Sequence, residues 1–136
     1  MVKTETEIER DVFRIIKASS LSSEIGGKVY RRGMRPMNSQ AEDAVVTFLS
    51  GEEGQEQTGV VVLNVFIPKT LFGSGTNKVE NLPRVEEIER IIVDLFTDYT
   101  DGEYWFDLRT TPQALDYDNI DQTAVYARIY YRRKIF

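Results

Sequence analysis

Two stretches in the middle of the chain carry a strand-type pattern, and a polar, acidic stretch joins them. Residues 43–49 and 58–67 are rich in β-branched residues, each with one Phe, while residues 50–57 are polar and interrupted by glycines. This pattern predicts a β-hairpin with a long loop. The loop contains three glutamates but no His, Cys, Lys or Arg. We therefore expect an arm that makes contacts and carries no catalytic chemistry.

Two further segments show the spacing of an amphipathic helix. We predict one helix over about residues 6–18 and a second that starts at the N-cap Asn81. Thr4 with Glu7 suits a capping box for the first, and Pro83 suits the first turn of the second. The two apolar stripes are Ile8, Val12, Ile15 and Ile16, and Val85, Ile88, Ile92 and Leu95.

Three more strands follow from alternation and composition. We predict them at about residues 28–32, at 103–108 with a continuation to about 117, and at 122–132. In the last strand an apolar face alternates with a basic and aromatic one: Val125, Ala127, Ile129 and Tyr131 on the first, and Tyr126, Arg128, Tyr130 and Arg132 on the second.

These elements predict an α+β fold in the order α-β-β-β-α-β-β. We expect an antiparallel β-sheet with two helices packed on one face. A chain of 136 residues suits a single domain over residues 1–136, with a core that needs no disulfide. The sequence has no apolar run of membrane-spanning length, and its acidic N-terminus does not resemble a signal peptide. We expect the protein in the cytoplasm, or in an assembly built there.

Two loop segments complete the pattern. The Ser-rich residues 19–23 and the pair Gly26-Gly27 predict a turn. Residues 69–80 predict a mobile loop, in which Leu71 and Phe72 are an isolated apolar pair. Either this pair folds back onto the core, or it docks on a neighbouring molecule.

The chain has no Cys and no His. It therefore lacks a disulfide framework, a thiolate nucleophile and the commonest transition-metal ligands. Catalysis that depends on a Ser-His-Asp or Cys-His arrangement is excluded within this chain. We expect a protein that is not an enzyme and that binds no cofactor.

Two residue clusters are candidates for binding sites, the first for a metal ion and the second, around Trp105, for a ligand pocket. Asp116, Asp118 and Asp121 do not fit a calcium loop, because Gly and Glu are missing at the required positions. We expect a solvated turn there. Trp105 stands between two aromatic neighbours at strand spacing, which favours core on one face and a partly covered rim on the other.

The net charge of −5 is unevenly distributed. Residues 28–35 and 122–136 are basic, whereas residues 42–56 and 80–121 are mainly acidic. Either charges of both signs simply solvate the surface, or copies pack with a basic patch on an acidic one. Under the second interpretation the interface candidates, together with the apolar pair Leu71 and Phe72, are Glu52, Glu53, Glu56, Arg31, Arg32, Arg35, Arg128, Arg132 and Arg133.

The C-terminal strand also suits nucleic acid. Tyr126, Arg128, Tyr130 and Arg132 combine rings for stacking with cations for phosphate contacts. The acidic sequence pI of about 4.8 and the absence of a nucleic-acid-binding motif argue against this alternative.

The organisation of the whole chain resembles the tail completion, or tail terminator, proteins of bacteriophages and prophages. The resemblance rests on a short N-terminal helix with a Ser/Gly break, the basic strand segment 28–36, the hairpin ending at Val65-Phe66-Ile67-Pro68, the helix 85–96 and a basic-aromatic end. The arm 51–59 and the loop 73–78 have no counterpart in a motif of that family.

The resemblance implies a structural virion protein without catalytic activity. Such a protein forms a ring, typically a hexamer, which caps the tail tube and joins it to the head. Its partners would be copies of itself, the tail tube and neck proteins, with DNA only as cargo passing through the ring. Its location would be the virion tail, after assembly in the bacterial cytoplasm. Another head–tail connector or neck protein is the alternative within this class.

Overall fold

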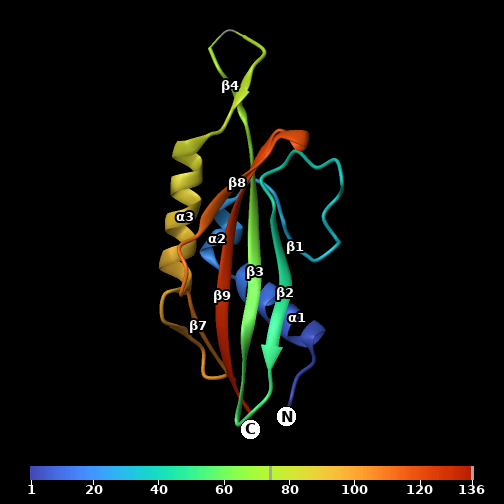
Figure 1. The fold of residues 1–136 in the computed structure, drawn as a ribbon, viewed down its shortest axis with the longest axis vertical. Coiled ribbons are helices and arrows are strands. Elements are labelled where there is room, and N and C mark those ends of the chain that lie inside the picture. Colours follow the sequence, from blue (N-terminus) through green and yellow to red (C-terminus); the bar gives the residue numbers. More distant parts are fainter. Residues whose placement is uncertain (74, 136) are drawn as a thin grey trace.

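The protein is described by a computed structural model covering residues 1–73 and 75–135, without the side chain of Asp118. Figure 1 shows the fold. The helices are α1 (Glu5–Lys17), α2 (Ser20–Glu24) and α3 (Leu82–Phe96), and a short 3-10 helix η1 spans Asp118–Ile120. The strands are β1 (Val29–Arg31), β2 (Ala44–Glu52), β3 (Glu56–Pro68), β4 (Thr70–Leu71), β5 (Lys78–Val79), β6 (Tyr99–Thr100), β7 (Tyr104–Asp107), β8 (Gln113–Tyr117) and β9 (Gln122–Lys134).

Seven strands form one sheet in the order β1-β2-β3-β9-β7-β6, and β8 pairs with β9 beyond β7. The α+β fold with a mostly antiparallel sheet confirms the prediction. One pairing differs, because β1 runs parallel to β2. The reason is that residues 32–43 carry the chain back along the side of the sheet before β2 begins (Figure 1).

The helices cover one face of the sheet, which lies in front of them in Figure 1. α1 contacts β1 and β2, α3 contacts β9 and β3, and α2 lies between the two longer helices. Both predicted apolar stripes point into this core, and each large side chain fully buried there contributes about 1.5–3 kcal/mol. The largest of them include Phe96, Phe106, Ile8, Ile16, Leu63 and Ile92.

The helix boundaries follow from their caps. Thr4 and Glu7 form the predicted capping box of α1, and the Asn81 side chain accepts the backbone N–H of Arg84 at the start of α3. The turn predicted over 19–23 is wrong, because this segment forms the short helix α2, which fully buries Leu21. None of the described helices is long and apolar enough to cross a membrane.

The β2–β3 hairpin has longer strands and a shorter loop than the sequence predicts. The two strands stay paired out to Glu52 and Thr58, so that only residues 53–55 connect them. Gly51 and Gly59 lie opposite each other, and the hydroxyl of Tyr131 occupies the space where their Cβ atoms would be. Strand pairing therefore continues through residues whose composition predicts a turn.

Residues 69–80 contain a second, smaller hairpin. β4 and β5 pair with each other and project beyond the end of the main sheet (Figure 1). Leu71 is 60% exposed and Phe72 is 69% exposed. The interpretation in which this pair folds back onto the core is therefore wrong.

The predicted strand over residues 103–117 is divided. β7 ends at Asp107 and β8 begins at Gln113, and both pair with β9 along successive parts of its length. Pro112 is buried immediately before β8 and lacks the N–H that a continuous strand would use. The break turns the intervening loop, with Arg109, outward.

The close approach at Gly59 predicts a large effect of a single methyl group. A Cβ at this position would lie 2.1 Å from the backbone oxygen of Ser50. The β2–β3 pair would have to separate, so we expect Gly59→Ala to lower the free energy of unfolding by about 1–3 kcal/mol. Gly54→Ala is the matched control, because its Cβ meets no described atom nearer than 3.5 Å. Urea denaturation of both variants checks the prediction, and equal stabilities would contradict it.

Candidate interaction surface

The sheet face opposite the helices has no helix over it among the described elements, and we call it the open face. The alternation predicted for the C-terminal strand is confirmed, with Arg128 and Arg132 exposed and Ala127 and Ile129 buried. Strand register places the residues of β3 and β7 beside them. The open face is formed by Val60, Val62, Asn64 and Phe66 of β3, Trp105 of β7, Arg109 of the following loop, and Tyr126, Arg128, Tyr130 and Arg132 of β9.

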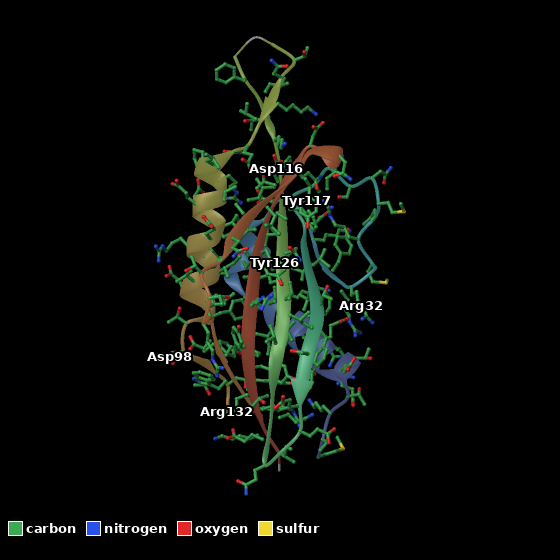
Figure 2. The ribbon with its side chains drawn as sticks, viewed as in Figure 1. Arg32, Asp98, Asp116, Tyr117, Tyr126 and Arg132 are labelled. Carbon is green, nitrogen blue, oxygen red and sulfur yellow. The ribbon has the colours of Figure 1, made fainter. Side chains whose placement is uncertain are left out.

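Arginine side chains lie over aromatic rings along the whole open face. Tyr126 is near its middle and Arg132 lies toward the β2–β3 hairpin end (Figure 2). The arginine–ring pairs follow β9 from Ala124, opposite Phe66, to Arg132. At about 3.4 Å per residue, this part of β9 spans roughly 27 Å. The guanidinium carbons lie 4.8 Å from the ring centroid for Arg132 over Trp105, 4.9 Å for Arg109 over Tyr130, 6.0 Å for Arg128 over Tyr126, and 4.2 Å for Arg35 over Phe66.

These side chains replace a second layer of secondary structure. Val60 is 9% exposed and Val62 is 6% exposed, although both lie on the open face. Long arginine stems and tyrosine rings cover the apolar strand surface and keep their polar ends in water. The sheet is therefore shielded without a helix on this side.

The same arrangement presents positive charge in a fixed geometry. A guanidinium that stacks on a ring keeps its N–H edge available for a carboxylate or a phosphate. Arg132 already pairs with Glu56 at 3.3 Å. Among the described residues, neither Arg109 nor Arg128 has a carboxylate within ion-pair distance. The open face can therefore bind an acidic partner through these two arginines.

One end of the open face is closed by a buried network around Asp43. The residue Asp43 is 1% exposed. Its carboxylate accepts hydrogen bonds from the Ser39 hydroxyl, the Lys28 backbone N–H and the Arg35 guanidinium. Arg35 also donates to Gln122 at 3.0 Å. Burial alone would raise the pKa of the Asp43 carboxyl, but the hydrogen bonds outweigh it and hold the pKa below its ordinary value of 3.8.

A second network lies at the opposite end of the sheet. Arg133 is 4% exposed and donates to Glu103 at 2.6 Å and to Gln57 at 3.0 Å. Lys3 pairs with Glu103 and with Asp11, which also accepts the hydroxyl of Tyr104.

The contacts of this network shift the pKa values of its members. Burial, then the hydrogen bond to Asp11, raises the pKa of Tyr104 well above its usual range. Burial would lower the pKa of Lys3, yet its hydrogen bonds to Asp11 and Glu103 raise it. All of these groups hold the N-terminal segment against the sheet.

Besides Arg132, which pairs with Glu56, three more of the predicted interface arginines make contacts within the chain. Arg35 and Arg133 belong to the two networks, and Arg31 donates to the buried Glu9 and to the Thr6 carbonyl. Glu9 in turn accepts the backbone N–H of Phe48 on the part of β2 that β1 does not cover. The sequence gives no sign of these partners, since they lie far away along the chain.

The remaining interface candidates lie on the surface. Glu52 and Glu53 are at the β2–β3 hairpin end, Arg32 is beside β1, and Leu71 and Phe72 are on the opposite, β4–β5 hairpin (Figures 1 and 2). The structure brings together only Glu56 and Arg132, which pair within the chain. For the others, a role in subunit contact stays a prediction.

Asp116 and Asp121 are each paired with a lysine, and the side chain of Asp118 lies outside the described part of the structure. Asp116 pairs with Lys69 at 2.7 Å and Asp121 with Lys78 at 3.4 Å, so the 69–80 segment supplies lysines that are not adjacent in sequence. Among the side chains that the structure describes, no group of three or more His, Cys, Asp or Glu residues could hold a metal ion. Trp105 is partly covered between the buried Tyr104 and Phe106, as predicted.

Sequence reasoning missed Arg109 and Phe66 as members of the open face. Arg109 follows β7 in an irregular loop, where no periodicity assigns it a side. Phe66 follows the alternation of β3, but its neighbour Arg35 comes from the loop before β2. The available sequence signal was this alternation, which puts Phe66 on the same side of β3 as Asn64; the structure adds that Phe66 lies opposite Ala124.

The Asp43 network predicts a pH-dependent stability. Because the folded-state pKa of Asp43 is depressed, its stabilisation is fully present above the unfolded-state pKa and is lost as pH falls through the folded value. We expect Asp43→Asn to cost about 2 kcal/mol at pH 7. The gap to wild type should shrink between roughly pH 5 and pH 2. Urea titrations across this range, with the exposed Asp94→Asn as control, measure it; a gap independent of pH would contradict the assignment.

Comparison with known proteins adds the fold alone. No protein-family model matches the sequence, and neither does any curated protein. Among solved structures, one chain superposes with a TM-score of 0.50 over 96% of this chain and 93% of its own length, at 16% sequence identity. At this identity, the similarity shows that the two chains share a fold.

Proposed function

We propose that this chain is a structural tail completion protein of a phage or prophage. In this proposal, copies form a ring that caps the tail tube and joins it to the head, and the protein catalyses no reaction. The observation that carries the proposal is the open face, about 27 Å of sheet lined with stacked arginines and aromatic rings. A sheet face of this kind, with its apolar surface covered and with exposed arginines and aromatic rings, suits repeated contact between protein subunits.

The shape of the chain supports an assembly with neighbours at both ends. The β2–β3 and β4–β5 hairpins project in opposite directions from the sheet (Figure 1). One ends in the exposed acids Glu52 and Glu53, and the other carries Leu71 and Phe72. A subunit of a ring needs lateral contacts to its neighbours and axial contacts to the tube and neck, and the hairpins suit the axial ones. DNA passes through the ring as cargo in this proposal.

A second candidate is a nucleic-acid-binding module. The specific observation in its favour is again the open face, because its rings suit bases, and Arg109 and Arg128, which have no carboxylate partner among the described residues, suit phosphates. Fluorescence anisotropy with a labelled single-stranded oligonucleotide separates the candidates. Salt-sensitive binding at physiological ionic strength would favour the module.

The proposed function predicts that the purified protein assembles on tail tubes. We expect it to co-sediment with purified tubes and to appear as a ring at the tube end in negative-stain micrographs. Binding to an isolated head or neck, with none to tubes, would instead assign another connector role. Protein that neither forms rings nor binds any virion part would overturn the proposal.

The acidic hairpin end predicts a salt-sensitive contact. Glu52 and Glu53 are exposed and have no ion-pair partner among the described residues. We expect Glu52→Lys/Glu53→Lys to weaken assembly by about fivefold at low salt, and less at high salt. Glu56 is kept because it pairs with Arg132. Sedimentation at two salt concentrations measures the effect, with Glu24→Lys as a control on another surface; equal losses in both variants would contradict it.

A further inference from the structure

We infer that the open face of one copy docks on the outer, acidic surface of α3 in the next copy. This inference rests on the proposed ring and names the two surfaces that meet in it. It begins with the unpaired charges of the open face. Arg109 and Arg128 are exposed, are positioned over Tyr130 and Tyr126, and have no carboxylate partner among the described residues.

The helix α3 offers the complementary charge. Glu87 pairs with Arg84 and Asp94 lies 4.0 Å from Arg90, whereas Glu86 and Glu89 have no ion-pair partner in the described part of the chain. Three residues apart on a helix, these two glutamates lie on the same side. Each surface therefore leaves two charges unpaired, and the charges have opposite sign.

The other long helix does not fit. The later turns of α1 present Arg10, Arg14 and Lys17 outside the core, and its acids Glu5 and Glu7 lie in the first turn alone, so most of its length would repel the open face. Charge complementarity thus selects α3 from the two helices that cover the back of the sheet.

The length of α3 also matches the length of the open face on which it would dock. α3 has 15 residues and is about 22 Å long, close to the roughly 27 Å of stacked pairs on the open face. It runs along the sheet beside β9 in Figure 1. Glu86 and Glu89 border a hollow of about 460 Å³ together with Arg90 and Pro112. Arg90 lies 4.0 Å from Asp94, so the two glutamates keep the rim of the hollow acidic and its volume leaves room for a side chain of the neighbour.

Because the open face and α3 belong to opposite layers, this contact is heterologous. Each copy would place its open face against α3 of the next copy. Such contacts generate a closed ring when the rotation between copies divides a full turn into equal parts. A face-to-face pairing of two open faces would instead join like charges and stop at a dimer.

The absence of cysteine permits a direct test with the full chain. Asn64→Cys places a thiol in the middle of the open face, opposite Tyr126, and Val93→Cys places one on α3 at the hollow bordered by Glu86 and Glu89, which both stay in place. In the buffer used for assembly on tail tubes, with a mild oxidant added, we expect a mixture of these two variants to form a disulfide-linked heterodimer. A mixture of Asn64→Cys with Arg14→Cys on α1 is the matched control and should form no disulfide-linked heterodimer.

Charge reversal provides the second measurement. We expect Arg109→Glu/Arg128→Glu and Glu86→Arg/Glu89→Arg each to weaken self-association by about tenfold. An equal mixture of the two variants should restore association, because each reversed surface meets its complement on the other variant. Circular dichroism confirms that each variant is folded, and the cysteine experiment leaves every arginine–ring pair intact.

The outcomes separate the inference from the function on which it rests. Wild-type rings with no crosslink, and with no loss on charge reversal, would overturn the docking surfaces and leave the ring. A crosslink of Asn64→Cys to itself would replace them with face-to-face pairing. Loss of oligonucleotide binding in Arg109→Glu/Arg128→Glu, with ring formation unchanged, would assign the open face to nucleic acid. A wild-type chain that never self-associates would overturn both proposals.

Discussion

The pairing of β3 with β9 is the constraint on which the rest of the structure depends. The two strands pair from Glu56–Lys134 to Pro68–Gln122 without a register shift. One side of this pair forms the floor of the core under α1 and α3, and the other side forms the open face. Because side chains alternate between the two sides, a slip of β9 by one residue against β3 would bury the arginines of β9 and expose Ile129. The core and the surface are thus fixed by one register.

Two buried polar networks secure the ends of this strand pair. Asp43 holds the loop before β2 to one end, and Arg133 holds the N-terminal segment to the other. Removing one partner from such a network leaves a buried charge unpaired, which costs more than the pair itself contributes. These charges therefore determine where distant segments attach, more than they add to stability.

The sequence alone predicts the elements whose periodicity is strong. The stripes of α1 and α3 and the two faces of β9 follow from residue spacing, and so does the α+β class. It does not predict features that depend on partners remote in the chain. The pairing of Gly51 with Gly59 extended the hairpin through a turn-like composition, and the direction of β1 depended on the path of residues 32–43. Likewise, Arg35 and Arg133 belong to a residue type that usually lies on the surface. They are covered because Asp43 and Gln122 bind the first, and Glu103 and Gln57 bind the second.

The arginine–ring pairs of the open face have a consequence for the kinetics of association. Their side chains are held in place before any partner arrives, so little rotamer entropy remains to be lost on contact. Nor do Val60 and Val62 become newly exposed when a copy is alone. Encounter between two such surfaces is then a rigid-body process, guided at long range by charge. Its on-rate, more than its off-rate, should carry the dependence on ionic strength.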